Sequence, residues 1–161
     1  MTTLVPMTES EYRAFAGTTV PAYAAEKVAS GEWAQEDAIE RAKKALATQL
    51  PQGLQSVGNH LYTIRDTPSS EPVGVLWIAV QERAGRRIAY VYDVSIDSRY
   101  RRRGYASRAF VALEDEVRKL GLFGISLHVF GHNHAAQALY AKLGYQPTNI
   151  TLFKPIGPAT G

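Results

Sequence analysis

The sequence predicts one α/β domain over residues 1–161, built on a mixed, mostly antiparallel and twisted sheet with helices on both faces. Two strand-like runs, 73–80 and 88–96, flank a short turn around Gly85, which is typical of an antiparallel hairpin. Beyond residue 104, helical and strand-like segments alternate, which is typical of a helical crossover between parallel strands. At 161 residues and 45% hydrophobic composition, the chain can bury a core of useful size.

The composition excludes several kinds of chemistry. The chain has no cysteine, so disulfides, thiolate catalysis and cysteine-based zinc sites are excluded. No run approaches the roughly 18 apolar residues of a membrane span, and the first residues lack a secretory signal pattern. We therefore expect a cytoplasmic protein that does not bind membranes.

Residues 1–58 are predicted to be mainly helical. Thr8 and Glu11 have the spacing of a capping box, which marks the start of a helix. Pro21 lacks an N–H donor and is expected to interrupt this helix, with a second stretch continuing to Gly31. Apolar residues keep helical spacing from 34 to 50, and Pro51 ends that helix.

The rest of the chain is predicted as short elements separated by turns. They are a strand over 60–65, a turn over 67–72, strands over 73–80 and 88–96, a helix over 104–120, a strand over 125–130, a helix from Asn133 through Leu143, a last strand or hairpin arm over 145–154, and a frayed tail over 157–161. The helix from 104 starts where strand 88–96 ends. Ligands of open α/β sheets bind at such strand ends.

An arginine- and glycine-rich stretch lies at this junction of strand and helix. Five arginines fall between Arg99 and Arg108. Gly104 allows a ligand to approach the backbone closely, and the first N–H groups of a helix have no intrahelical acceptors. Together with the helix dipole and the arginines, these donors predict a site for a phosphate-bearing ligand.

The positive charge is local, which argues against a nucleic-acid partner. The net charge is +3 and the sequence pI is near 9.2. A nucleic-acid interface normally spreads basic residues over a face and adds aromatic residues or a known motif. We therefore do not expect nucleic acid as a partner. The sequence also lacks the P-loop and dinucleotide fingerprints, so we do not expect ATP or NAD as the ligand.

Two blocks of residues carry a family resemblance. The first is Arg101-Arg102-Arg103-Gly104-Tyr105-Ala106, and the second runs from Ser126-Leu127-His128-Val129-Phe130 through Asn133 and Ala136 to Leu139-Tyr140-Ala141-Lys142-Leu143-Gly144-Tyr145. Their content and order resemble the GNAT superfamily of acetyl-CoA-dependent N-acetyltransferases, whose phosphate motif is Gln/Arg-x-x-Gly-x-Gly/Ala. The resemblance covers roughly 88–146 and implies a GNAT-like fold with this part as the acetyl-CoA-binding core. Residues 1–58 would then be the helical region on the acceptor side.

The resemblance also implies roles along the cofactor. Backbone groups of Val94 and Ile96 would pair with the pantetheine arm, and N–H groups from Arg101 to Ala106 would hold the pyrophosphate. A backbone N–H near Val94 or Ser95, turned outward by a bulge, would stabilise the developing oxyanion.

Further candidate residues surround the expected position of the thioester. By resemblance, Asn133 would contact the cofactor arm or cap its helix near Ala136, and Tyr140 would protonate the leaving thiolate. His128 is the first candidate for the general base, because imidazole takes a proton near pH 7 and similar ribosomal-protein acetyltransferases carry glutamate there. The alternative for His128 is a hydrogen-bonded sheet residue. Asp93 is the second candidate base, because a carboxylate inside an apolar strand is costly to bury without a partner or a role.

Several other side chains have both structural and functional interpretations. Trp33, Trp77 and Tyr92 either line an acceptor pocket or belong to the core. His132 and His134 are expected to be solvated, and we expect no metal site.

We therefore expect an enzyme that transfers an acetyl group directly from acetyl-CoA to a primary amine of a small molecule or protein. The alternative is a non-catalytic CoA-binding sensor or partner-binding module. The acceptor is not specified by the sequence, and a homodimer stays open.

Overall fold

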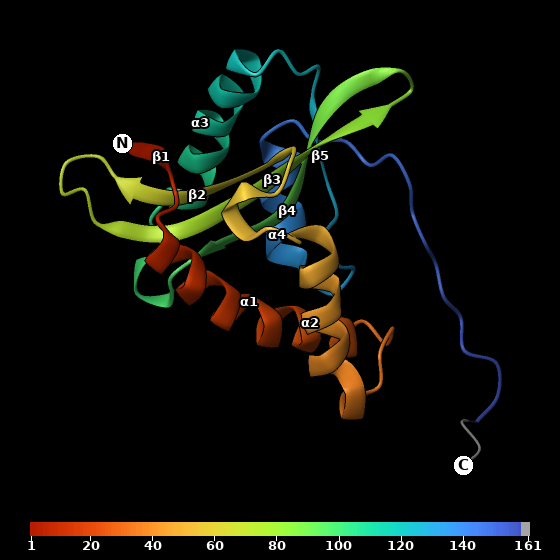
Figure 1. Cartoon of the computed structure of the whole chain (residues 1–161). Helices are drawn as coiled ribbons and strands as arrows, with labels where there is room; N and C mark the ends of the chain where they lie inside the picture. The colour runs from red at the N-terminus through yellow and green to blue at the C-terminus, as the bar shows by residue number, and fades with distance from the viewer. Residues whose placement is uncertain (159–161) are drawn as a thin grey trace.

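The computed structural model describes residues 1–158, which contain five strands and four α-helices (Figure 1). They are β1 (Thr2–Pro6), α1 (Glu9–Ala29), α2 (Ala38–Gln49), β2 (Asn59–Asp66), β3 (Pro72–Arg83), β4 (Arg86–Ile96), α3 (Tyr105–Lys119), β5 (Ile125–Leu127) and α4 (His134–Lys142). Within this described part, no helix is both long enough and apolar enough to cross a membrane.

The strands form one sheet in the order β1-β2-β3-β4-β5, and only the β4–β5 pair is parallel. The β3–β4 hairpin turns at Ala84 and Gly85, whose φ angles of 50° and 78° suit a tight hairpin loop. α3 provides the crossover that a parallel β4–β5 pair requires. The predicted mixed, mostly antiparallel sheet is confirmed.

Helices cover both faces of the sheet, as predicted. On one face, Phe110 of α3 packs with Leu76 of β3, and Tyr140 of α4 lies against the same cluster. On the other face, Phe15 of α1 packs with Trp77 of β3. Neighbouring residues of a strand point to opposite faces, so β3 contributes to both cores. Figure 1 shows α3 on one side of the strands and the α1–α2 pair on the other.

Pro21 does not interrupt the first helix, so that expectation is wrong. α1 is continuous from Glu9 to Ala29 with Pro21 inside it. Proline removes the one hydrogen bond that would reach the carbonyl of Gly17, and Pro21 lies on the exposed side of the helix. One turn later, Ala24 is buried against Ala38 and Ala42 of α2. This packing holds the helix together across the proline.

The two ends of the chain also differ from the expected strand order. The N-terminal strand β1 pairs with β2 and was not predicted, because five residues ending in Pro6 give too short a pattern. The strand expected over 145–154 is absent, since no helix or strand occurs between Gln146 and Pro158. The strand expected over 125–130 is limited to Ile125–Leu127. The expected frayed tail falls mostly on 159–161, which lie outside the described residues.

Candidate active site

The last residues of β4 have an unpaired edge on the side of β5. β5 pairs with β4 only at Ala89, Tyr90 and Val91, whereas β4 continues to Ile96. On its other side, β4 remains paired with β3 as far as Gly74 and Ile96. No strand in the described chain therefore pairs with the β5 side of residues 92–96. Backbone groups on such an edge can bind an extended ligand as a further strand would bind.

A β-bulge at Tyr92 lies where this free edge begins. The register between β3 and β4 shifts after Trp77, which leaves Tyr92 as the extra residue before Asp93. The bulge therefore comes earlier than the expected position near Val94 or Ser95. The Tyr92 and Trp77 rings stack with their centroids 4.7 Å apart, which anchors the bulge on the α1 side of the sheet.

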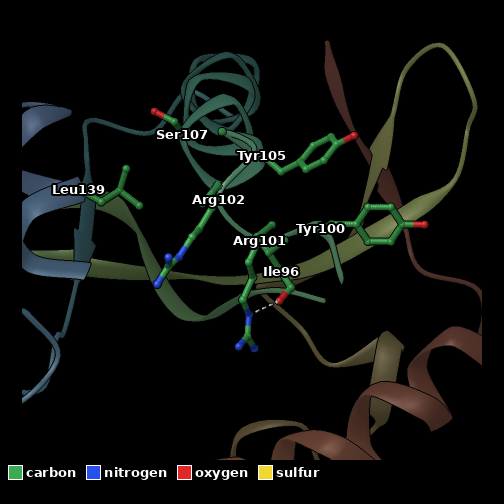
Figure 2. A pocket seen from close by; sticks show the side chains of 9 residues that line it. Ile96, Tyr100, Arg101, Arg102, Tyr105, Ser107 and Leu139 are labelled. Atoms are coloured by element: carbon green, nitrogen blue, oxygen red, sulfur yellow. Dashed lines mark hydrogen bonds between the residues drawn. The ribbon is translucent and has the colours of Figure 1, made fainter. Parts of the chain in front are cut away.

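The loop from Asp97 to Gly104, here called the Arg/Gly loop, and the start of α3 surround a hollow of about 250 Å³ (Figure 2). Its lining residues are Ile96, Tyr100, Arg101, Arg102, Gly104, Tyr105, Ala106, Ser107 and Leu139. Gly104 has a φ of 81° and begins α3 with no side-chain cap from the described residues. Arg102 also has a positive φ, of 62°. Left-handed residues next to a helix start gather N–H groups into a concave anion site, which is the geometry that the predicted phosphate site needs.

The arginines of the hollow lie beside the end of β4. Figure 2 shows the Arg101 and Arg102 side chains pointing to the same side. Arg101 Nε donates a hydrogen bond to the carbonyl oxygen of Ile96 at 3.0 Å. That carbonyl is therefore already used, and Val94 has the freer backbone of the two residues expected to pair with pantetheine.

Arg103 and the two neighbouring tyrosines serve a different purpose. The Arg103 guanidinium lies 5.8 Å from the ring centroid of Tyr100 and does not line the hollow. The Tyr100 and Tyr105 rings point away from the Arg101 and Arg102 side chains in Figure 2. The Tyr105 hydroxyl donates to Asp66 of β2 at 3.2 Å. These side chains fix the loop to the sheet, so Tyr105 borders the hollow through its position at the helix start.

Asp93 has an unusual protonation equilibrium for a carboxylate. Burial raises the pKa of Asp93 from 3.8 to about 6, although the backbone N–H of Val94 and the Thr19 hydroxyl of α1 stabilise the charged form. The Asp93 residue is half-buried, so part of its surface is still open. A carboxylate that titrates near pH 6 is ionised at neutral pH and can accept a proton from a bound substrate.

Tyr140 lies within electrostatic range of Asp93. Burial raises the pKa of the Tyr140 phenol, and the negative charge of Asp93 raises it further. The Tyr140 ring packs edge-on against Phe110 of α3 at 5.4 Å and against Tyr145 at 5.8 Å. The phenol is therefore protonated at neutral pH and held in one orientation, as a proton donor must be.

His128 occupies a more open position. It follows the last residue of β5 and is exposed, with its ring 4.8 Å from the ring of Phe130. It lies within electrostatic range of Glu32, in the turn after α1. His128 makes no hydrogen bond with any other residue of the described chain. The sheet-histidine alternative for this residue is therefore not supported.

The turn before α4 joins that helix to α1. Asn133 caps α4, because its Oδ1 accepts the backbone N–H of Ala136 at 3.1 Å. His132 and His134 are exposed, as expected, and Nε2 of His132 also lies 2.9 Å from Oε2 of Glu26 in α1. Within residues 1–158, no three His, Cys, Asp or Glu side chains are grouped so that they could hold a metal ion.

Of the three aromatic residues proposed for an acceptor wall, Trp77 and Tyr92 stack on each other, and Trp33 packs against a different cluster. Trp77 is buried in the sheet core, and its Nε1 donates to Asn59 at 2.8 Å. Trp33 instead packs edge-on against Tyr23 at 5.5 Å, beside the ammonium group of Lys27. Trp77 therefore belongs to the core, as one of the two interpretations had it.

Sequence reasoning assigned no individual role to four residues at the site. They are Thr19, Ser107, Arg108 and Leu139. Thr19 lies in the middle of a helix far from Asp93 in sequence, so no local pattern identifies it. Leu139 reaches the hollow from α4, and Ser107 from the first turn of α3. For Ser107 and Arg108, the sequence offers one signal of a role at the site, which is their position in the first turn of α3 after Gly104.

Comparison with known proteins places this arrangement among the acetyltransferases. The family model for the acetyltransferase (GNAT) family matches residues 25–145. YycN of Bacillus subtilis, named an uncharacterized N-acetyltransferase, is 36% identical over 95% of this chain and 97% of its own. YdgE of the same organism carries the same description and is 33% identical over 96% of this chain and 98% of its own.

Solved structures agree with that assignment. The crystal structure of YycN superimposes with a TM-score of 0.92 at 35% identity, covering 98% of this chain and 100% of the YycN chain. A GCN5-related N-acetyltransferase from Ralstonia eutropha shares the fold, with a TM-score of 0.68 at 18% identity over 97% of this chain and 99% of its own. This protein belongs to the GNAT acetyltransferase family. It is an acyltransferase by that membership, and the predicted family and GNAT-like fold are confirmed.

Proposed function

We propose that this protein transfers an acetyl group from acetyl-CoA directly to a primary amine, with Asp93 as general base and Tyr140 as general acid. The observation that carries the proposal is the pairing of these two groups. A carboxylate with a pKa of about 6 and a phenol held protonated lie within electrostatic range of each other at the unpaired end of β4. Proton acceptor and proton donor with separated pKa values are what an acyl transfer to an amine requires.

The Arg/Gly loop fits the pyrophosphate of acetyl-CoA. A Cβ at Gly104 would lie 2.8 Å from Nη1 of Arg108, so the absence of a side chain leaves room beside a guanidinium group. Backbone N–H groups from Arg101 to Ala106, with the Arg101 and Arg102 side chains, would hold the phosphates. This loop lies at the end of β4, so a ligand anchored there reaches the free edge at Val94.

The edge of β4 and the start of α4 would then position the thioester. Bound acetyl-CoA supplies the acetyl thioester, and the chain supplies the geometry. The backbone of Val94 would pair with the pantetheine arm, and an N–H near Val94 would donate to the developing oxyanion, because Ser95 is turned towards Val75 of β3. The side-chain amide of Asn133 has its oxygen engaged in the α4 cap at Ala136, and its NH₂ would contact the cofactor arm.

Proton transfer follows from the positions of the two titratable groups. An alkyl ammonium group has a pKa of about 10.4, so a base must take a proton before the nitrogen can attack. The Asp93 carboxylate accepts that proton. The Tyr140 phenol donates its proton to the departing sulfur. The attacking nitrogen releases its second proton to solvent as the amide forms, and solvent returns a proton to Tyr140. Asp93 is preferred over His128 for the base, because it is more buried and its charge acts on the phenol of Tyr140.

A thiol-release assay tests the proposal directly. Acetyl-CoA is supplied with a panel of protein N-terminal peptides, lysine peptides, polyamines, aminoglycosides and small amino compounds. Release of free thiol with one amine class, together with calorimetric binding of acetyl-CoA, is the expected result. Binding without turnover across the panel would favour the non-catalytic CoA-binding module, and absence of binding at millimolar acetyl-CoA would contradict the proposed ligand.

Replacing Tyr140 with phenylalanine is expected to lower kcat by about 10²-fold or more, because the leaving thiolate loses its proton donor. The affinity for acetyl-CoA should not change, since the ring packing on Phe110 is retained. The measurement is steady-state kinetics with calorimetry. Tyr145→Phe is the matched control, because Tyr145 belongs to the same aromatic cluster and should lose little activity. Full turnover by Tyr140→Phe would remove Tyr140 from the acid role.

Thr19→Val is expected to raise the pKa of Asp93, because the carboxylate loses a hydroxyl that stabilises its charged form. The rising limb of the kcat/KM profile should move to higher pH by a few tenths of a unit or more, with little change in activity at pH 8. Thr19 acts through Asp93 and is a positioning residue. Thr18→Val is the control, since the neighbouring Thr18 hydroxyl bonds to the carbonyl of Phe15. An unchanged limb in Thr19→Val contradicts this role.

A further inference from the structure

The chain after α4 leaves the body of the protein as an extended segment. Tyr145 is the last residue held in place, with its N–H bonded to Tyr140 and its ring against Phe110. From Gln146 to Ile156, here called the C-terminal arm, every residue is exposed. Figure 1 shows this arm running away from the sheet and helices. No backbone hydrogen bond joins it to any other described residue.

The arm has the composition of a β-strand that is buried against a neighbour. Its large apolar side chains are Ile150, Leu152, Phe153 and Ile156, which are 74%, 88%, 88% and 83% exposed. Burial of such a side chain typically contributes about 1.5–3 kcal/mol, so the arm as it stands leaves a large stabilisation unused. Pro147 and Pro155 bracket a proline-free stretch, 148–154, with β-branched and aromatic residues. This stretch lies within residues 145–154, for which the sequence predicts a strand or hairpin arm.

A matching edge lies on the same molecule. β5 is the last strand of the sheet and has β4 as its one strand partner in the described chain. Beside it is a hollow of about 360 Å³, lined by Ile88, Phe123 and Ile125 among others, and Phe123 is 68% exposed. α4, which follows β5 in the chain, has no buried residue although its sequence is rich in alanine. Unpaired edges of this kind are normally covered.

We propose that two copies of this chain exchange their C-terminal arms, so that residues 148–154 of each copy add a strand to the β5 edge of the other. The arm leads away from its own β5, so one copy by itself leaves both surfaces in water. A two-fold pair covers both edges with both arms at once, and such an isologous arrangement closes without leaving a free edge for a third copy. The alignment with YycN covers 98% of this chain, so that relative has a counterpart to most of the arm.

Light scattering of the full chain tests the exchange. The expected result is a dimer of twice 17.7 kDa at micromolar concentration. A chain ending at Gln146, and a full chain carrying Leu152→Asp with Phe153→Asp, should both be monomers that keep their helical circular dichroism. Val57→Asp is the matched control, because Val57 is 94% exposed outside the arm, and it should remain a dimer. A monomeric full chain, or a dimer that survives loss of the arm, would overturn the proposal.

Cross-linking distinguishes exchange from a return of the arm to its own sheet. The chain has no cysteine, so introduced cysteines are the only thiols. A Ser126→Cys chain and a Leu152→Cys chain are mixed, unfolded and refolded together, and treated with a short bismaleimide. A cross-linked heterodimer is expected, and a Val57→Cys chain mixed with Ser126→Cys should give none. If instead the double variant on one chain cross-links within itself and runs as a monomer, the arm pairs with its own β5 and the exchange is wrong.

Discussion

Replacing Asp93 with asparagine is expected to lower kcat/KM by about 10²- to 10⁴-fold, the range by which a positioned proton acceptor accelerates such reactions. The amide keeps the size and the hydrogen-bond acceptor of the carboxylate, so Val94 and Thr19 retain a partner. What is lost is the group that takes a proton from the incoming amine. The measurement is thiol release at saturating acetyl-CoA, with calorimetry to show that acetyl-CoA affinity is retained.

The pH dependence separates this role from a structural one. Asp93 must be ionised to act, and its pKa is about 6, so wild-type kcat/KM should fall with a slope of one below pH 6 and level off above it. The Asp93→Asn variant should show no plateau there, since its rate follows the free amine up to the acceptor pKa of about 10. Asp97→Asn, an exposed carboxylate near the end of β4, is the charge-matched control and should keep the wild-type profile. A plateau that persists in Asp93→Asn would point to another base.

The same substitution should make the protein more stable at neutral pH. The pKa of Asp93 is raised from 3.8 to about 6 in the folded chain, so between these values the folded state binds more protons than the unfolded state. Stability contributed by this group therefore falls as pH rises through that window and stays low above it. The shift corresponds to about 3 kcal/mol. Urea unfolding should show Asp93→Asn gaining up to that amount at pH 7.5 and almost nothing at pH 4.

The features that could be predicted from the sequence are those set by neighbours along the chain. The capping box of α1 is present, because Thr8 and Glu11 satisfy each other's backbone N–H groups locally. Asn133 caps α4 for the same reason. Gly104 has the positive φ that its place between strand and helix requires. The phosphate-type loop and the start of α4 are built from such local rules.

What could not be predicted depends on contacts between distant segments. Pro21 is tolerated because α2 packs across the helix that contains it. Thr19 approaches Asp93 only because α1 crosses the sheet there. Relative burial separates Asp93 from His128, and burial is a property of the folded chain. The segment 145–154 has strand composition, but a strand also needs an edge to bind, and a single copy of the chain does not bring one to it.

Gly104→Glu is expected to abolish measurable binding of acetyl-CoA, a loss of at least about 100-fold in affinity. The new carboxylate would occupy the helix start at which the pyrophosphate is proposed to bind, and like charges there repel. The position also has a φ of 81°, which costs a side chain about 1–2 kcal/mol of strain, so stability must be measured beside affinity. Gly104→Gln carries the same strain and bulk without the charge and should bind more tightly than Gly104→Glu.

Gly121→Glu completes the comparison, since Gly121 follows the other end of α3 with a φ of 70° and open space around it. It adds the same charge and similar strain to the same helix, far from the Arg/Gly loop, and should bind acetyl-CoA normally. Equal loss of binding in Gly104→Glu and Gly121→Glu would mean that destabilised α3, and not the charge at the anion site, controls affinity. Unchanged binding in Gly104→Glu would place the pyrophosphate elsewhere.

Because the guanidinium groups of Arg101 and Arg102 border the hollow, replacing both with glutamine should weaken the binding of acetyl-CoA and reduce the salt dependence of that binding. The reduced salt dependence would tie the effect to charge.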